Sequence, residues 1–231
     1  MYISHVLFDM DGLILDTEPL YTAATVQVAE KHGSPVEYTW NLKVQQMGLP
    51  RMDLARKVIS DLQLPISPEQ YIRETVEIQE TLFPGAKLLP GAERLINHLA
   101  ESGVPIALAT SSPRDSYLVK TRNHQELFKK FLHVVNGSDD PEVKHGKPSP
   151  DIFLVCSSRF SSPPLHLENC LVFEDSPAGV KAALSAGMKC VMVPDSRMFS
   201  TPEYIPTGVT KVIPSLEQFL PAEFELPEYK S

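Results

Sequence analysis

Cysteine, tryptophan and long apolar runs are scarce in this chain, and each scarcity excludes a class of protein. The 231 residues include one tryptophan and three cysteines, Cys156, Cys170 and Cys190, which form no CxxC pair. An odd number of cysteines with apolar neighbours predicts buried free thiols in a reducing compartment. No run approaches the roughly 20 apolar residues of a membrane span, and the opening MYISHVLF lacks the pattern of a secretory signal. The expected location is therefore cytoplasmic.

Positive charge is also in deficit. Lysine and arginine total 21 against 29 acidic residues, which gives a formal net charge of −8. Nucleic-acid polymers and anionic membranes are bound mainly by excess lysine and arginine, so neither is expected as a partner. A small phosphorylated metabolite needs only a few local cations and is still a possible partner. The length and the 42% hydrophobic content predict a globular chain, with one domain of ordinary size and a smaller insertion.

Short apolar runs alternate with amphipathic helical segments along most of the chain. Continuous apolar runs of four to six residues suit strands that are buried on both faces, and the intervening helices make such strands parallel. The expected fold is α/β, a Rossmann-like open parallel sheet with its ligands at the carboxyl ends of the strands. The expected strands are 5–8, 104–109, 132–135, 170–173 and 189–193.

The first two runs are separated by some ninety residues without a convincing strand, far more than a crossover requires. We expect an inserted α-helical cap domain over 18–86, with the core domain formed by 1–17 and 87–231. Because the insertion leaves and re-enters beside the strand ends, it is placed to act as a lid. Trp40 is expected to pack in a hydrophobic core, with stacking on a substrate base as the alternative.

Helix starts are marked by capping chemistry. Ser176 precedes Pro177, a proline suited to the first helical position, and Gly187 follows the last turn of VKAALSA. Ser67 and Gln70 have the spacing of a capping box at the start of a helix.

Carboxylates follow two of the expected strands directly. Asp9 and Asp11 come after the run VLF, with Gly12 allowing a sharp turn, and Glu174 and Asp175 come after LVF. An Asp-Gly turn or an acidic helix start would explain either pair alone. If both strands are central neighbours, the acids converge, and such convergence is costly unless it holds a hard divalent cation. Mg²⁺ fits best, because it accepts few protein carboxylates and keeps positions free for water or phosphate.

Two further segments offer groups for phosphate. Thr110, Ser111 and Ser112 supply hydroxyl and backbone N–H groups at a turn that enters a helix, although such a run is also an ordinary cap. Lys147 lies between Gly146 and Pro148, which suits a cation held in a fixed position better than one on a helix face.

The motifs FDMDG, ATS, GKP and FED, in this order and at these intervals, resemble those of the haloacid dehalogenase-like phosphatase superfamily. The insertion resembles the helical cap of the subgroup with β-phosphoglucomutase and small sugar-phosphate phosphatases. The stretches FDMDGLILDTE and LVFEDSPAGVKAALSAGM resemble most closely the pseudouridine-5′-phosphatase branch, and plant glycerol-3-phosphatases carry similar stretches.

The resemblance implies an enzyme, a phosphoric monoester hydrolase that works by two-step phosphoryl transfer. Asp9 would attack phosphorus and form an aspartyl-phosphate, and Asp11 would protonate the leaving oxygen and later accept a proton from water. Neighbouring carboxylates push their pKa values apart, so one can stay protonated while the other is anionic. The resemblance also implies that Thr110 and the Ser111 N–H hold the phosphoryl group. Lys147 would neutralise its charge.

The implied Mg²⁺ ligands are the Asp9 and Asp175 carboxylates and the Asp11 backbone carbonyl. Glu174 would bind the metal through water or pair with Lys147. The implied substrate is pseudouridine 5′-phosphate, with glycerol 3-phosphate or another sugar phosphate as the alternative. A phosphomutase and a catalytically silent interaction module are the weaker alternatives. We expect a monomer or a weak homodimer.

Substrate choice is expected to lie in the cap. The stretch MGLPRMD, residues 47–53, resembles the specificity loop of the subgroup. Gly48 would form its turn, and Arg51 would reach the distal part of the substrate. A solvated arginine at the start of a surface helix is the alternative for Arg51.

Overall fold

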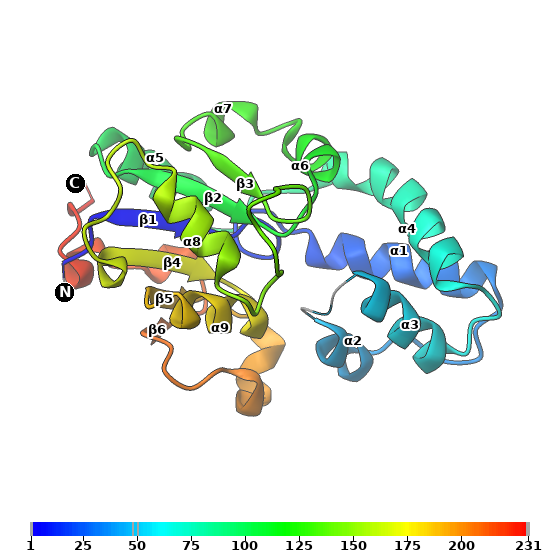
Figure 1. The fold of residues 1–231 in the computed structure, drawn as a ribbon. Helices are drawn as coiled ribbons and strands as arrows, with labels where there is room; N and C mark the ends of the chain where they lie inside the picture. Colours follow the sequence, from blue (N-terminus) through cyan, green and yellow to red (C-terminus); the bar gives the residue numbers. More distant parts are fainter. Residues whose placement is uncertain (1, 48, 50, 230–231) are drawn as a thin grey trace.

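Six parallel strands form the centre of the molecule in the computed structural model, which describes residues 2–47, 49 and 51–229. Their order across the sheet is β3-β2-β1-β4-β5-β6 (Figure 1). The bounds are His5–Phe8 (β1), Ile106–Thr110 (β2), Val134–Asn136 (β3), Cys170–Glu174 (β4), Lys189–Met192 (β5) and Lys211–Val212 (β6). The α/β fold and its parallel sheet are confirmed.

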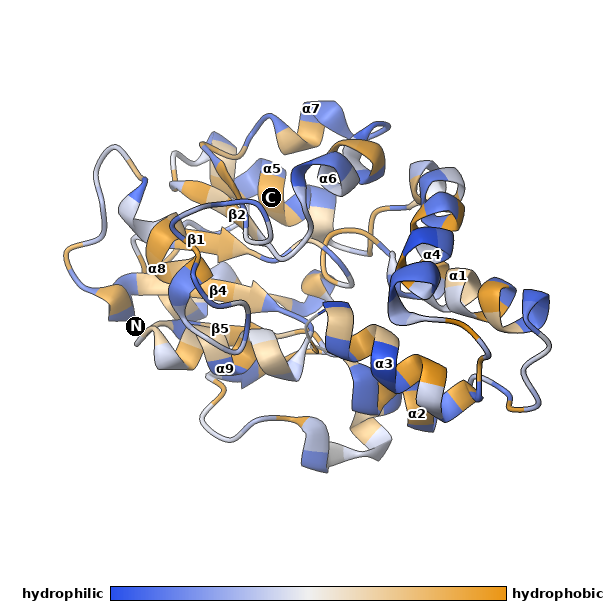
Figure 2. Cartoon of the chain, turned by 45° about the vertical axis from the view of Figure 1, so that its right-hand side comes forward, coloured by the Kyte–Doolittle hydropathy of each residue, from blue (hydrophilic) through white to orange (hydrophobic). Residues whose placement is uncertain are grey.

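The apolar runs form strands because both faces of the sheet are covered. On one face Phe8 and Phe173 stack with ring centroids 5.0 Å apart, in the hydrophobic cluster that includes residues of α5 (Ala92–Glu101) and α7 (Gln125–Phe128). On the other face Leu7 and Val172 pack with residues of α8 (Asp151–Ser158) and α9 (Pro177–Ser185). The resulting strands β1 and β2 have hydrophobic colours along their length (Figure 2). All three cysteines are buried and free, as expected.

The strand β6 was not expected from the sequence. It contributes two partly buried residues, Lys211 and Val212, at the sheet edge. A pair that includes a lysine gives no apolar run, so its strand conformation depends on pairing with β5 rather than on its own composition.

Four of the five described helices between β1 and β2 form a unit that projects from one end of the sheet (Figure 1). They are α1 (Glu18–Lys31), α2 (Trp40–Gln46), α3 (Arg51–Leu62) and α4 (Pro68–Leu82), followed by the 3₁₀ turn η1 (Phe83–Gly85). Their apolar residues, among them Val28, Val58 and Tyr71, form a cluster separate from the two on the sheet. We call this unit the cap. Its division from the core at residues 17 and 87 stays a prediction. None of the described helices is both long and apolar enough to cross a membrane.

The N-cap residues of two helices test the capping that the sequence predicts. The Ser176 side chain accepts a hydrogen bond from Gly179 N at 3.1 Å and starts α9, as predicted. The Ser67 side chain accepts from Gln70 N at 3.2 Å. The Gln70 side chain does not complete a reciprocal box, because its amide donates to Glu74 at 2.9 Å.

Trp40 lies at the contact between the cap and the core rather than inside the cap. It packs against the sheet cluster that contains Met198, and the Arg197 guanidinium lies 3.9 Å from the centroid of its ring. Arg197 belongs to η3 (Ser196–Ser200), which follows β5. The cap is therefore seated against the core on this side.

Candidate active site

Strand pairing brings the predicted carboxylates together. Strands β1 and β4 are neighbours, with Phe8 opposite Phe173, so the residues that follow each strand emerge side by side. Carboxylate oxygens of Asp9, Glu174 and Asp175 all lie within 4.8 Å of one another. All three residues are buried. We call these three residues the carboxylate cluster.

Lys147 supplies the cation of the cluster. Its Nζ donates to Asp9 Oδ1 at 2.5 Å and to Glu174 Oε1 at 2.6 Å. It also donates to the Ala109 carbonyl at 3.3 Å. The loop before α8 therefore carries a lysine whose side chain is only 7% exposed and bridges β1, β2 and β4. Lys147, which the sequence singled out between Gly146 and Pro148, thus lies against Asp9 and Glu174.

Glu174 is held from its other side by the start of α9. Its Oε2 accepts from the backbone N–H groups of Asp175 and Ser176, each at 3.1 Å. A Cβ on Gly179 would lie 1.8 Å from Glu174 Oε1. Any side chain at position 179 would therefore displace this carboxylate, so Gly179 is a residue of the site that the sequence reasoning missed. The motif FEDSPAG contained the signal, because its glycine lies one turn after the acids.

The cluster carries more negative charge than its lysine compensates. Burial raises the pKa of Asp9 to about 7, against the opposing effect of Lys147 and with a further increase from Glu174. Burial raises the pKa of Asp175 well above its ordinary value, with Glu174 and Asp9 acting in the same direction. Burial tends to lower the pKa of Lys147, but Asp9 and Glu174 outweigh this effect and raise it. A second positive charge is what the cluster lacks.

The donor set of the cluster fits a hard divalent cation. Its oxygens come from carboxylates, it is buried, and its pKa values report charge that the protein alone does not neutralise. Asp175 also lines a cavity of about 220 Å³ that contains Gly12 and Glu18, so a ligand can reach it. The residues present thus match a magnesium site.

Gly12 allows the first strand to turn close to Asp175. Its φ is +77°, and a Cβ there would lie 2.3 Å from Asp175 Oδ2 and 3.3 Å from Glu18 Cγ. Only glycine fits both the left-handed backbone and the close approach.

Asp11 lies in a separate group of hydrogen-bond donors. Its Oδ1 accepts from Lys120 Nζ at 2.6 Å and from Thr17 Oγ1 at 2.8 Å, and its Oδ2 accepts from Ser112 Oγ at 2.8 Å. Burial works to raise the pKa of Asp11, but the Lys120 ammonium and these hydrogen bonds outweigh it and lower the pKa. The pKa values of Asp9 and Asp11 are therefore pushed apart, with Asp11 as the more acidic partner.

Lys120 and Thr17 were missed by the sequence reasoning, whereas Ser112 was expected as a donor to phosphate and here donates to Asp11. Lys120 belongs to α6 (Arg114–Thr121), in the stretch RDSYLVKT, which has the composition of a surface helix. It is 109 residues from Asp11 along the chain. No local pattern in the sequence indicates that Lys120 contacts Asp11.

The predicted phosphate turn follows β2 as expected. Thr110 is fully buried, and its Oγ1 accepts from Ser112 N at 3.1 Å. Ser111 is exposed, and its carbonyl accepts from Ser138 Oγ at 2.6 Å. The roles of Thr110 and Ser111 toward phosphate stay a prediction.

The cap residues give less support. Arg51 is exposed at the first position of α3, which is the solvated alternative for this residue, and Gly48 lies outside the described residues.

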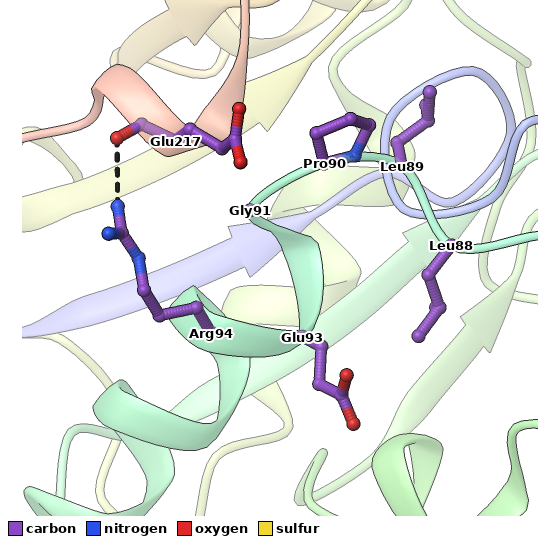
Figure 3. A pocket seen from close by; sticks show the side chains of 7 residues that line it. All are labelled: Leu88, Leu89, Pro90, Gly91, Glu93, Arg94 and Glu217. Carbon is purple, nitrogen blue, oxygen red and sulfur yellow. Dashed lines mark hydrogen bonds between the residues drawn. The ribbon is translucent and has the colours of Figure 1, made fainter.

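A larger hollow of about 330 Å³ lies between residues 88–94 and Glu217, where Arg94 donates to the Glu217 carbonyl at 2.8 Å (Figure 3). No residue of the carboxylate cluster lines it, so the chemistry points to the smaller cavity.

Comparison with known proteins places this geometry in a family. The model of the haloacid dehalogenase-like hydrolases matches residues 3–187. A Drosophila melanogaster protein named "Probable pseudouridine-5′-phosphatase" is 49% identical over 227 residues, 98% of this chain and 96% of that protein. (DL)-glycerol-3-phosphatase 2 of Arabidopsis thaliana is 42% identical and covers 99% of this chain and 93% of its own length.

The fold also matches a solved structure. The crystal structure of HAD hydrolase, family IA, variant 3 from Entamoeba histolytica superimposes with a TM-score of 0.77 at 23% identity, over 96% of this chain and 97% of that chain. With the family model spanning the cluster of Asp9, Lys147, Glu174 and Asp175, the chain belongs to the haloacid dehalogenase-like hydrolase family.

Proposed function

We propose that this chain hydrolyses pseudouridine 5′-phosphate to pseudouridine and phosphate, with Mg²⁺ bound at the carboxylate cluster. The chain is a phosphoric monoester hydrolase, as its family and its named phosphatase relatives indicate. The observation that carries the proposal is the buried cluster of Asp9, Glu174 and Asp175 with Lys147 against it. The 49% identity over 98% of the chain supports the substrate.

Asp9 is the proposed nucleophile. One of its oxygens attacks phosphorus, the bond from phosphorus to the leaving oxygen breaks, and Asp9 carries the phosphoryl group until water hydrolyses it. Lys147 keeps a positive charge at 2.5 Å from Asp9 Oδ1, where it offsets charge on the incoming phosphate. Thr110 and the Ser111 N–H are the proposed donors to the phosphoryl oxygens.

Asp11 is the proposed acid and base. It gives a proton to the leaving ribose oxygen in the first step and takes one from the attacking water in the second. The hydrogen bonds that it accepts from Thr17, Ser112 and Lys120 fix its carboxylate. They favour its anion, which takes a proton from the attacking water in the second step. That proton is the one that Asp11 gives to the leaving oxygen in the first step of the next turnover.

The proposed Mg²⁺ ligands are the Asp9 and Asp175 carboxylates and the Asp11 carbonyl, with Glu174 close by. When bound, Mg²⁺ supplies positive charge against the oxygens of the transferring phosphoryl group. Glu174 already pairs with Lys147 and with the start of α9, which favours a supporting role for it.

Glycerol 3-phosphate is the second candidate substrate. The Arabidopsis thaliana relative named for it is 42% identical and covers 99% of this chain. The cap residues at 47–53 that are proposed to discriminate include Arg51, which stays a candidate through its place at the start of α3.

The test is kcat/KM for pseudouridine 5′-phosphate, uridine 5′-phosphate and glycerol 3-phosphate with Mg²⁺ and with a chelator. We expect pseudouridine 5′-phosphate to lead the series and the chelator to abolish turnover of all three. Glycerol 3-phosphate leading would replace the proposed substrate. Full activity of Asp9→Asn on p-nitrophenyl phosphate would reject the mechanism.

A further inference from the structure

Lys120 has an environment that a helix lysine rarely has. Its side chain is fully buried, and its ammonium donates to Asp11 Oδ1 at 2.6 Å, to Tyr21 Oη at 2.6 Å and to Ser112 Oγ at 2.7 Å. An ammonium has three donors, so these bonds satisfy it completely. A buried charge is tolerated only with such pairing.

The contacts of Lys120 come from both parts of the molecule. Asp11 and Ser112 belong to the core, whereas Tyr21 is on helix α1 of the cap. The Lys120 Nζ also lies 4.8 Å from the centroid of the Tyr21 ring and 4.6 Å from that of Phe83 in η1. The two rings pack edge to face with centroids 5.0 Å apart. Both segments that join the cap to the core therefore contribute to the enclosure of this ammonium.

The same contacts fix the Asp11 carboxylate. Ser112 donates to Asp11 Oδ2 and accepts from Lys120, so the three residues form a closed ring of hydrogen bonds. Removal of the ammonium would leave Asp11 with two neutral donors and free its side chain to change rotamer. A proton-transfer group loses rate steeply when it is out of reach of the proton that it moves.

We propose that Lys120 is a positioning residue that holds Asp11 in place for proton transfer, and that Tyr21 completes this hold when the cap is seated. The inference rests on the proposed role of Asp11. In the first step Asp9 bonds to phosphorus, the leaving oxygen departs with its electron pair, and the proton of Asp11 joins that oxygen. Lys120 gives up no proton and touches no reacting atom.

The test compares leaving groups in the variant Lys120→Met. An alkoxide needs the Asp11 proton, whereas p-nitrophenolate leaves without it. We expect kcat/KM for the alkyl phosphate, pseudouridine 5′-phosphate or glycerol 3-phosphate, to fall about 100-fold, and kcat/KM for p-nitrophenyl phosphate to fall less than about tenfold. Thr121→Val is the matched control, because Thr121 is a buried neighbour on α6 whose hydroxyl donates to the Tyr117 carbonyl at 2.8 Å. Thr121→Val is expected to leave unchanged the ratio of kcat/KM for the alkyl phosphate to kcat/KM for p-nitrophenyl phosphate.

A second arm uses Asp11→Asn. If Lys120 acts through Asp11, Lys120→Met in that background causes little further selective loss, because the group that it positions can no longer transfer the proton. Equal losses on both substrates, a gain on the alkyl phosphate, or full additivity with Asp11→Asn would overturn the inference. A wild type that turns over neither substrate would instead reject the proposed function.

If Lys120→Met does not fold, the variant Tyr21→Phe tests the positioning role of Lys120 instead. This variant removes one hydroxyl and leaves the Lys120–Asp11 pair intact. A smaller loss with the same preference for the alkyl phosphate supports the positioning role. An equal loss on both substrates contradicts it.

Discussion

At the scale of single residues, the carboxylate cluster requires glycine at two positions beside it. Gly12 and Gly179 each leave room for one carboxylate, since a Cβ would come within 2.3 Å of Asp175 Oδ2 and 1.8 Å of Glu174 Oε1 respectively. Asp175 and Glu174 can occupy their positions in the cluster because Gly12 and Gly179 beside them carry no side chain. The placement of the carboxylates therefore depends on these two glycines.

The variant Gly12→Ala tests this idea. The new methyl group would displace the Asp175 carboxylate, so we expect the Mg²⁺ concentration for half-maximal activity to rise about 10- to 100-fold, as for other residues that support metal ligands. The measurement is a Mg²⁺ titration of p-nitrophenyl phosphate hydrolysis.

Gly33→Ala is the control for backbone strain. Gly33 has a similar φ of +67°, but a Cβ there meets nothing within 4 Å. Both variants lose stability of about 1–3 kcal/mol from the left-handed backbone, and only Gly12→Ala should weaken the metal response. A matching loss of Mg²⁺ response in Gly33→Ala would show that strain alone is responsible.

At the scale of elements, a buried acid links the two longest helices of the cap. Glu74 on α4 accepts from His32 Nε2 at 2.8 Å and from Gln70 Nε2 at 2.9 Å. Its Oε2 lies 3.0 Å from Lys31 Nζ. Hydrogen bonds from Gln70, His32 and Lys31 lower the pKa of Glu74 to about 2. The ionised form is the one that ties α4 to the end of α1.

This pKa predicts how the stability of the cap depends on pH. A carboxyl whose folded pKa is depressed contributes stability above its unfolded pKa of 4.5, and the contribution disappears as the pH falls toward about 2. Glu74→Gln should therefore lower the free energy of unfolding by about 1 kcal/mol at pH 7, a modest value because the pair with Lys31 is near solvent. The difference from wild type should shrink steadily below pH 4.5.

Urea unfolding at pH 7, 4.5 and 3.5 measures this difference. Glu77→Gln, an exposed position on the same helix, is the control and should differ little from wild type at each pH. A Glu74→Gln effect that stays constant or grows in acid would contradict the assigned role of the carboxylate.

At the scale of the whole molecule, the cap is seated on the core by contacts on two sides of the site. Trp40 of α2 lies under Arg197 of η3, which Asp195 holds through Nε at 2.8 Å and Nη2 at 2.6 Å. Tyr21 of α1 bonds Lys120 of α6 on the other side. The core thus carries the proposed catalytic residues, and Tyr21 of the cap bonds the lysine that pairs with Asp11.

Sequence reasoning located what local pattern encodes. Each acid follows an apolar run directly, so Asp9 and Asp175 could be placed at strand ends from the sequence. That the two strands are neighbours follows only from the pairing of β1 with β4. Lys147 could be placed because glycine and proline flank it. Lys120 could not be predicted as a residue of the site, because its burial depends on Tyr21 and Phe83. These two residues are far from Lys120 and from each other in the sequence. Trp40 packs against a hydrophobic core cluster, as the sequence predicted. Its partner Arg197 could not be predicted, because it lies in a 3₁₀ turn without a recognisable pattern.

The measurement that tests the central claim most directly is identification of the phosphorylated residue. Wild-type enzyme in excess over substrate, with Mg²⁺, is quenched in acid within the first turnover, and its peptides are mapped by mass spectrometry. The account predicts one phosphoryl group on the peptide that contains Asp9 and none in Asp9→Asn. Phosphate on another residue, or complete turnover by Asp9→Asn, would contradict it.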